Sequence, residues 1–335
     1  MTDRETATGG AGAAREPAAA AQPGGGFPAP RHCQLPNGME VSYHSRAEVG
    51  FFYQDIFEKQ IYIKHGVELK DGDCVFDVGA NVGFFTLFAH RRARNVRVYA
   101  FEPAPPLFEA LSENVARHGV NARLFNCGVS DRSRTAAFTF YPNSSGMSSF
   151  YADEREEREA LRAIMQNQLR QGVEGMERVM RHADELLDER LKALRYECRL
   201  RTLSEVIAEE RVGVIDFLKV DVQKSELDVL RGVADEDWPK IRQIVIEVHD
   251  LGGRLDEIRG MLEGRGYAVA VEQDDHYEES ILYNLFARRA DARPETQGAA
   301  ATLDEEARRQ ARERARRQEE AMSRRRQLTN QKKGR

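Results

Sequence analysis

From Asp73 onward, short apolar segments alternate with segments that carry apolar residues at helical spacing. This alternation constrains the fold most, because strands that alternate with helices form a parallel sheet covered by helices on both faces. We therefore expect an α/β fold with a mostly parallel seven-stranded sheet and with helices over 106–118 and 225–233. The expected strands cover residues 74–78, 96–101, 122–127, 215–222, 241–248, 267–271 and 282–287.

The two ends of the chain differ in composition from this central part. Residues 1–37 are rich in Ala, Gly and Pro and lack apolar periodicity, so we expect them to be disordered. They contain no basic region followed by an apolar stretch, so we do not expect a signal peptide there. We expect one domain over residues 38–288, followed by a charged, basic tail over 289–335.

Charge separates the tail from the domain. Residues 288–335 carry 15 Lys or Arg against 8 Asp or Glu, whereas the formal net charge of the whole chain is −5. The domain is therefore acidic, which disfavours nucleic acid as its partner. The helix-prone stretch 303–326 lacks an apolar stripe, so we expect a solvated helix, and docking of this tail to another protein is the alternative.

Cysteine usage and hydropathy indicate a cytoplasmic protein. No apolar run reaches the roughly 18 residues that a membrane-spanning helix needs, so we expect no membrane partner. Widely spaced thiols without a CxxC pair indicate reduced cysteines rather than a disulfide framework or a zinc site. The four cysteines are Cys33, Cys74, Cys127 and Cys198.

Residues 153–195 interrupt the strand and helix alternation with apolar residues at helical spacing. We expect a helical insertion of two or three helices, which is either a packed excursion or a lid over a substrate pocket. Just before it, we expect an antiparallel pairing of 136–141 with a partner near 148–151.

The segment Cys74 to Gly83 reads CVFDVGANVG, an apolar strand that leads through glycines into an apolar helix. Glycine lets the backbone approach a ligand closely, and a helix N-terminus offers N–H groups to a carboxylate or phosphate. The next expected strand ends at Glu102, whose carboxylate can accept both ribose hydroxyls of an adenosine. The two features lie in one βαβ unit and indicate a nucleoside site.

The charge of the turn distinguishes between nucleoside ligands. A dinucleotide fingerprint has glycine where Asn81 stands, and no Gly-Lys-Ser/Thr follows as in a P-loop. Asp77 suits the cationic amino group of S-adenosylmethionine better than a diphosphate, and N–H groups near Asn81 and Gly83 can bind its carboxylate. The residues therefore favour S-adenosylmethionine over NAD, and an α/β fold with another ligand stays open.

Over residues 40–288 the chain resembles the FkbM family of S-adenosylmethionine-dependent methyltransferases. Besides VFDVGANVGFFT and VYAFEPAPPLFEAL, it has LFNCGVSDRS, IDFLKVDVQKSELDVLRG and IRQIVIEVHD in matching order. The family pattern DVEGAE has Glu-Gly-Ala where Gln223, Lys224 and Ser225 stand, so the role of that Glu is not carried over. The resemblance implies a Rossmann-like class I methyltransferase fold and O-methylation of a hydroxyl on a specialised metabolite of polyketide or nonribosomal peptide type.

The resemblance also implies which residues contact the cofactor. The turn after the first strand would hold the methionine end, the end of the second strand the ribose, and the end of the third strand the adenine, while the end of the fourth would lie beside the methyl group. The turn residues are Asp77, Gly79, Ala80, Asn81 and Gly83. At the end of the second strand the residues are Glu102 and Pro103, and at the end of the third they are Asn126 and Cys127. At the end of the fourth they are Val220 and Asp221.

A sulfonium-bound methyl group is already activated, so the protein must align an acceptor and remove a proton. Candidate bases at strand ends are Asp221, Glu247, His249 and Asp250. We prefer His249, with Asp221 as a second catalytic residue, because an imidazole with a pKa near 6.5 is mostly neutral at pH 7. Alternatively, His249 only bonds the sheet edge or orients a carboxylate. Asp221 with Glu247 or His249 is also a conceivable Mg²⁺ site, although no spacing requires a metal.

The acceptor is expected to be a small molecule, either free or bound to a carrier. Two other functions stay open at this point. One is an N-methyltransferase acting on an amine, and the other is a non-catalytic module that binds a nucleoside without chemistry.

Overall fold

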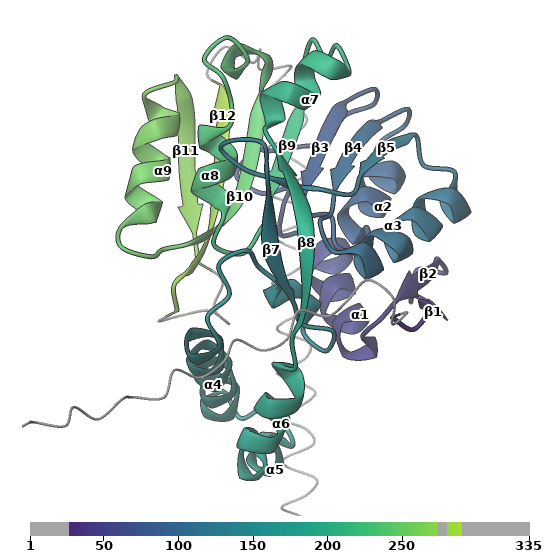
Figure 1. Cartoon of the computed structure of the whole chain (residues 1–335), viewed down its shortest axis with the longest axis vertical. Helices are drawn as coiled ribbons and strands as arrows, with labels where there is room; N and C mark the ends of the chain where they lie inside the picture. Colours follow the sequence, from purple (N-terminus) through teal and green to yellow (C-terminus); the bar gives the residue numbers. More distant parts are fainter. Residues whose placement is uncertain (1–26, 274–279, 290–335) are drawn as a thin grey trace, which may run out of the picture. The chain divides into compact units, whose positions relative to one another are not determined.

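The computed structural model describes residues 27–273 and 280–289. At its centre is the expected seven-stranded sheet, with the strands in the order β11-β12-β10-β9-β3-β4-β5 (Figure 1). β12 is antiparallel to both of its neighbours, β10 and β11, whereas the remaining pairs are parallel. The predicted Rossmann-like α/β fold is therefore confirmed. The strands are β3 (Cys74–Val78), β4 (Arg97–Phe101), β5 (Ala122–Phe125), β9 (Phe217–Val220), β10 (Gln243–His249), β11 (Tyr267–Glu272) and β12 (Leu282–Arg289).

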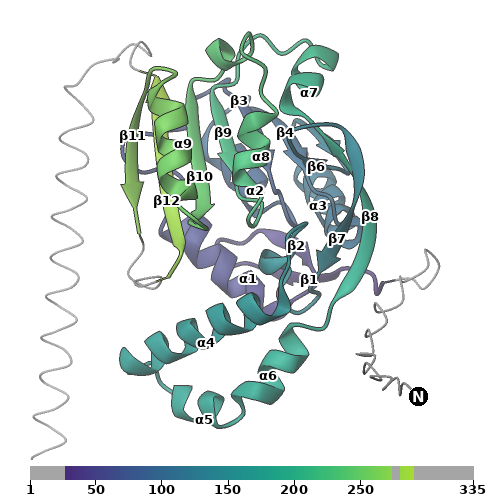
Figure 2. The same cartoon turned by 60° about the vertical axis from the view of Figure 1, so that its left-hand side comes forward.

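Helices cover both faces of this sheet (Figure 2). Successive strand residues point to opposite faces, so Val75 and Val245 pack in one apolar cluster while Phe76 and Ile246 pack in the other. The first cluster includes α1 (Arg46–Tyr53), α2 (Phe84–Arg92) and α3 (Pro105–His118), and a π-helical turn, η1 (Gln54–Glu58), continues α1. The second includes α7 (Leu203–Glu209), α8 (Glu226–Arg231), η3 (Trp238–Lys240) and α9 (Arg254–Glu263).

Polar residues replace apolar ones near the carboxyl ends of the strands, on the face that α1, α2 and α3 cover. Asp77 follows Val75 at spacing two in β3, and Glu247 follows Val245 in the same way in β10. Lys219 lies between them in β9 and is the register partner of Asp77. Because alternate residues share a face, these three charges lie on one side of the sheet.

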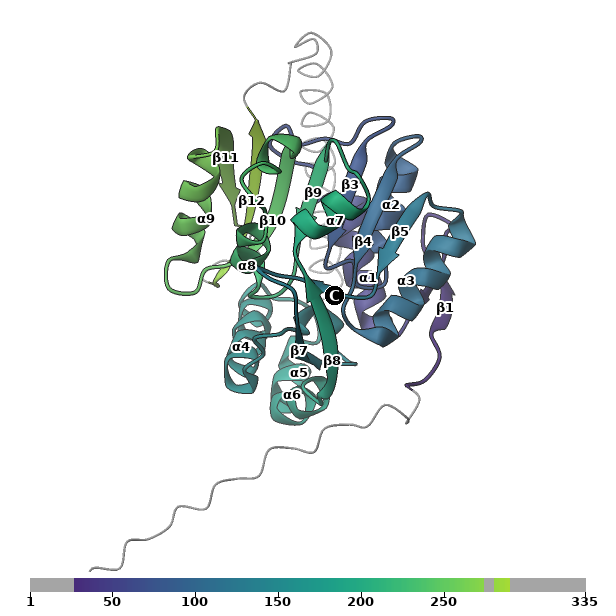
Figure 3. The ribbon, with the colours of Figure 1, turned by 45° about the horizontal axis from the view of Figure 1, so that its top comes forward.

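Between β5 and α7 the chain forms a second sheet, a 3₁₀ turn and three helices (Figure 3). The small sheet has the order β6-β8-β7, formed by β6 (Gly128–Val129), β7 (Arg134–Phe140) and β8 (Leu194–Arg201). The helices of this segment extend beyond the main sheet and confirm the expected helical character of 153–195. They are the 3₁₀ turn η2 (Ser145–Met147) and the helices α4 (Glu154–Arg170), α5 (Met176–Arg181) and α6 (Ala183–Arg190).

The predicted antiparallel pairing of 136–141 with 148–151 is confirmed only at one bridge, and the main partner of β7 was missed. β7 pairs with β8 along its whole length, from Arg134 opposite Leu200 to Phe140 opposite Leu194. Only one bridge joins β7 to the expected partner, between Thr139 and Ser149. The reason is that the intervening residues form η2, whereas β8 offers a full set of backbone partners.

The amino-terminal segment is more ordered than its composition predicts. β1 (Arg31–Gln34) pairs with β2 (Glu40–Tyr43), so the expected disorder over residues 1–37 is wrong for 31–34. The hairpin is held on α3, where the Asn114 amide donates to the Ser42 carbonyl and its oxygen accepts from the Ser42 N–H. Residues 1–26 and the predicted basic tail from 290 lie outside the described residues. Among the described helices, none is long and apolar enough to cross a membrane.

The turn between β3 and α2 requires glycine at its first position. Gly79 has φ +79°, and a Cβ atom there would lie 1.8 Å from the carbonyl oxygen of Asp221. The backbone at the end of β3 therefore lies directly against the backbone that follows β9. This contact brings the ends of two central strands together.

Gly79→Ala should lower the free energy of unfolding by at least about 2 kcal/mol, because the added carbon overlaps backbone and the φ angle is unfavourable. Gly213→Ala is the matched control, since open space surrounds Gly213. Urea unfolding of both variants checks this. An equal effect of the two substitutions would contradict the close approach.

Candidate active site

A cavity of about 780 Å³ lies where β3, β4, β9 and β10 end. This is the place at which open α/β sheets bind ligands. Helices α1 and α4, the turn η2, the loop after β9 and the start of β12 complete its walls. Much of the lining is apolar, with a smaller number of polar groups on the sheet side, as is typical of small-molecule sites.

A buried ion pair lies beneath the cavity. The Lys219 ammonium is 3.2 Å from Asp77 Oδ1 and donates a 2.7 Å hydrogen bond to the Gly79 carbonyl. Thr86 donates to Asp77 Oδ2 at 2.7 Å. Burial alone would lower the pKa of Lys219, but the charges of Asp77 and Asp221 outweigh it and raise that pKa. The ammonium is therefore charged and fixes the glycine turn.

The structure gives Asp77 a different place from the predicted ligand contact. Its side chain has no exposed area and does not line the cavity. Asp221 does line it, and Asp221 Oδ2 accepts a 2.8 Å hydrogen bond from the Tyr62 hydroxyl. Burial and the charge of Asp221 raise the pKa of Tyr62 well above its usual value, so this hydroxyl stays a donor. Asp221, rather than Asp77, therefore presents a carboxylate to the cavity.

Glu102 ends β4 at the cavity wall, as predicted. Its Oε2 accepts from the Asn81 N–H at 2.8 Å, and its Oε1 accepts from the Ala104 N–H at 2.9 Å. Burial raises the pKa of Glu102 to about 7. Each oxygen retains a further lone pair, so the carboxylate can still bind hydroxyl groups. Pro103 lines the cavity beside it.

The other predicted cofactor residues divide into lining and supporting groups. Gly79, Ala80, Asn81 and Cys127 line the cavity. The remaining ones lie behind this surface and support it. Gly83 precedes α2, Val220 is fully buried in β9, and Asn126 donates its amide to the Glu102 and Pro103 carbonyls.

A serine-rich segment at η2 forms part of the wall that the sequence did not predict. The Asn81 amide donates to Ser145 Oγ at 3.0 Å, and the Gly146 N–H donates to Glu48 at 3.0 Å. Ser144 and Ser145 both line the cavity. The run NSSGMSS, small polar residues between two strands, is the signal that marks this segment.

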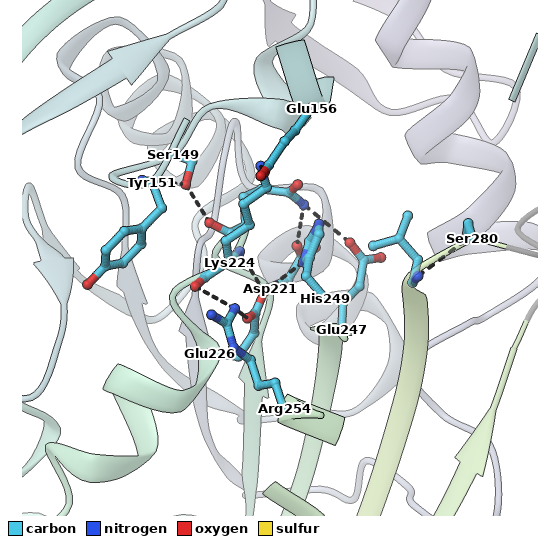
Figure 4. Close-up of polar contacts among 12 residues, drawn as sticks. Ser149, Tyr151, Glu156, Asp221, Lys224, Glu226, Glu247, His249, Arg254 and Ser280 are labelled. Carbon is cyan, nitrogen blue, oxygen red and sulfur yellow. Dashed lines mark hydrogen bonds and ion pairs between the residues drawn. The ribbon is translucent and has the colours of Figure 1, made fainter. Parts of the chain in front are cut away.

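His249 is paired with a buried carboxylate (Figure 4). His249 Nδ1 lies 2.8 Å from Glu226 Oε1, and Arg254 donates to Glu226 Oε2 at 3.2 Å. Burial alone lowers the pKa of His249, but the hydrogen bond and charge of Glu226 outweigh it and raise that pKa. His249 lines the cavity, whereas Glu226 is fully buried and does not. Glu226 was not predicted, although an acidic residue just after a strand-end loop is a detectable signal.

Gln223 joins Glu247 to Asp221. Gln223 donates to Glu247 Oε1 at 3.2 Å and to Asp221 Oδ1 at 3.4 Å. Burial and the charge of Asp221 raise the pKa of Glu247 to about 8. At neutral pH this side chain is therefore mainly a neutral acid.

The remaining base candidate and the conceivable metal site gain no support from the geometry. Asp250 does not line the cavity, and its Oδ1 accepts from the Leu255 N–H in the first turn of α9. Within the described ranges, no three His, Cys, Asp or Glu side chains are grouped to hold a metal ion. His249 in particular uses Nδ1 to meet Glu226 rather than to join Asp221 around a cation.

A family model and several relatives with similar sequences are described as methyltransferases. A family model described as "Methyltransferase FkbM domain" matches residues 77–269. The 31-O-demethyl-FK506 methyltransferase FkbM of Streptomyces tacrolimicus is 43% identical over 261 residues, which are 76% of this chain and 96% of that protein. Methyltransferase sdnD of Sordaria araneosa is 30% identical over 271 residues, 77% of this chain and 97% of that protein.

In two further comparisons, the similar region covers less than half of the other protein. The AMB antimetabolite synthetase AmbE of Pseudomonas aeruginosa is 40% identical over 262 residues, which are 76% of this chain and 12% of AmbE. A crystal structure of methyltransferase FkbM from Methylobacillus flagellatus aligns with a TM-score of 0.41 at 13% identity, covering 67% of this chain and 45% of that one.

Glu247→Gln should stabilise the protein at alkaline pH. Folded Glu247 keeps its proton up to about pH 8, whereas an unfolded glutamate loses it near pH 4.3. Folded wild-type protein therefore loses stability as pH rises between these values, and the amide variant does not. Since one pKa unit corresponds to about 1.4 kcal/mol, the free energy of unfolding of the variant relative to wild type should rise by about 4 kcal/mol between pH 5 and pH 9.

Urea unfolding at several pH values measures this difference. Glu58→Gln is the control, because Glu58 is exposed in η1. A difference between the Glu247 variant and wild type that does not grow with pH would contradict the raised pKa.

Proposed function

The chain belongs to the FkbM family of methyltransferases, and from this premise we propose that it transfers a methyl group from S-adenosylmethionine to a hydroxyl of a specialised metabolite of polyketide or nonribosomal peptide type. The observation that carries the proposal is the Glu226–His249 pair at the wall of a cavity that also contains the strand-end carboxylate Glu102. The relative from Streptomyces tacrolimicus, whose name specifies an O-demethyl compound, supports oxygen as the acceptor atom.

The residues at the cavity fit S-adenosylmethionine. The strand-end carboxylate of Glu102 suits ribose hydroxyls, and the carboxylate of Asp221 suits the methionine ammonium. Amide and hydroxyl groups of Asn81 and Ser145 suit the methionine carboxylate, and Cys127 would border the adenine. The missing side chain of Gly79 lets the backbone at Asp221 approach the turn closely, which keeps the Asp221 carboxylate beside the glycine turn. When bound, S-adenosylmethionine supplies a methyl group activated on a sulfonium.

His249 is the proposed general base. Donating the Nδ1 proton to Glu226 leaves Nε2 as the acceptor nitrogen of the neutral ring, and no hydrogen bond joins Nε2 to another described residue. The imidazole would take the proton that the acceptor hydroxyl loses as its oxygen gains the methyl group. Glu226 then stabilises the imidazolium that forms, as a buried carboxylate does for a catalytic histidine.

The apolar walls from α1 and α4 would exclude water from this proton transfer. Phe52 and Ile56 line the cavity from the α1 side, and Leu161 and Ile164 line it from α4. These side chains also suit an acceptor with a substantial apolar surface, since apolar contact removes water from both partners. Asp221 would then orient the acceptor or the ammonium beside the transfer site.

N-methylation is the second candidate function. Asp221 and Glu247 share one part of the cavity wall, and two carboxyl groups there can hold a cationic amine. An amine must also lose a proton before it accepts a methyl group, which His249 could assist. Mass spectrometry of the product distinguishes the two, because the fragment that carries the new methyl group contains either the oxygen or the nitrogen.

Calorimetry with S-adenosylhomocysteine tests the proposal, and we expect saturable binding by the wild-type protein. Glu102→Gln should weaken binding about tenfold or more, the change that 1.4 kcal/mol of lost interaction produces. Glu113→Gln is the control, since Glu113 bonds Ser42 and His32 at the surface hairpin. A folded wild-type sample that does not bind S-adenosylhomocysteine would defeat the proposal. Binding without turnover on any acceptor would favour the non-catalytic module.

Glu226→Gln should lower the pKa of His249. In the wild-type protein Glu226 raises this pKa above its ordinary value, so the ring becomes a base only as pH rises through the raised value. The substitution removes the charge but not the burial, which favours the neutral ring. Histidine NMR titration, with His249→Gln to assign the signal, measures the shift, and the acid limb of the pH–rate profile should move to lower pH. An unchanged titration would remove Glu226 from the mechanism.

A further inference from the structure

Lys224 has an unusual backbone conformation for its residue type. It lies in the loop between β9 and α8, with φ +70°. This is the left-handed region, which glycine adopts freely and other residues adopt at a cost. Lys224 stands at the glycine position of the DVEGAE pattern. A lysine in this conformation needs a compensating interaction.

Its side chain supplies that interaction by reaching the helical insertion. Lys224 Nζ lies 2.9 Å from Glu156 Oε2 and 3.0 Å from Glu157 Oε1, both in the first turn of α4. The side chains of Lys224 and Glu157 are only 6% and 7% exposed, whereas Glu156 is 48% exposed. Burial would lower the pKa of Lys224, but the two glutamates outweigh it and raise that pKa. The contact is thus a charged, largely desolvated ion pair rather than a surface one.

The main chain of the same residue supports the proposed base. The Lys224 N–H donates at 2.8 Å to Glu226 Oε1, the oxygen that also meets His249. The Lys224 carbonyl accepts a 2.7 Å hydrogen bond from Arg254, whose guanidinium also reaches Glu226. One residue is therefore joined to α4 by its side chain and to the Glu226–His249 pair by its backbone (Figure 4).

We propose that Lys224 is a positioning residue that fastens α4 over the cavity and so controls access of the acceptor. α4 supplies a continuous part of the cavity wall, including Leu161, Ile164 and Met165. With its first turn fixed by Lys224, this wall is attached to the loop between β9 and α8, whose backbone contacts the Glu226–His249 pair. The expected effects on turnover rest on the proposed function, whereas the effect on α4 itself does not.

Hydrogen–deuterium exchange of residues 154–170 in the ligand-free protein tests the attachment directly. Lys224→Gly keeps the left-handed backbone without steric cost and removes the ion pairs. We expect exchange in this segment to become about tenfold faster or more, the factor that a loss of 1.4 kcal/mol in local stability produces. Lys224→Arg should retain protection, because its guanidinium can meet both carboxylates.

Glu154→Gln is the matched control. Glu154 lies in the same first turn of α4 but is 71% exposed and contacts Arg158 instead. Its substitution should leave exchange of 154–170 within about twofold of wild type, as for an exposed helix pair. The double variant Glu156→Gln, Glu157→Gln removes the same ion pairs without altering the loop. It therefore decides the question even if Lys224→Gly does not fold.

Kinetic measurements distinguish a positioning role of Lys224 from a role in stability alone. Lys224→Gly should release S-adenosylhomocysteine faster and raise the acceptor KM about tenfold, with kcat changed much less, and Lys224→Arg should restore both. Unchanged exchange of 154–170 in folded Lys224→Gly and in the double variant would overturn the proposal. If wild-type protein does not bind S-adenosylhomocysteine, the proposed function fails, while the exchange result still decides the role of Lys224.

Discussion

Two opposite charges buried between neighbouring strands hold the candidate site in place. Asp77 and Lys219 are register partners in β3 and β9, and both side chains are almost without exposed area. Such burial is unfavourable unless each charge keeps several partners. Thr86 donates a hydrogen bond to the Asp77 carboxylate, and the Gly79 carbonyl accepts one from the Lys219 ammonium. The glycine turn, the strand ends and the cavity floor are therefore fixed by one ion pair.

The same face of the sheet carries different chemistry along its width. At Asp77, the buried carboxylate lies 3.2 Å from the Lys219 ammonium. At Glu247, burial and the charge of Asp221 outweigh the charges of His249 and Lys219, so the pKa rises to about 8 and the group is mainly neutral. At His249, burial lowers the pKa, but the hydrogen bond and charge of Glu226 outweigh burial and raise it. The environment of each residue, rather than its type, therefore determines the pKa of its side chain.

Local patterns were sufficient to predict the sheet but not the partners of its charged residues. The strands of the main sheet were predictable because buried parallel strands are apolar runs, and the glycine turn was predictable from CVFDVGANVG. The pairing of β7 with β8 was missed, since nothing near 134–140 encodes a partner that lies beyond three helices. Asp77 was assigned to a ligand because its partner, Lys219, is remote in sequence. A lysine within an apolar strand is the signal that identifies such a buried pair.

The sequence separation of these contacts has a consequence for biosynthesis. Lys219 meets the Gly79 carbonyl across 140 residues, and His249 lies later still in the chain. Loops of this length close slowly and only after the intervening chain is made. A nascent chain that has completed only its first βαβ unit therefore has the glycine turn without its cation. Ligand affinity would arise late, with docking of β9 and β10, so that a bound nucleoside selectively stabilises molecules whose assembly is complete.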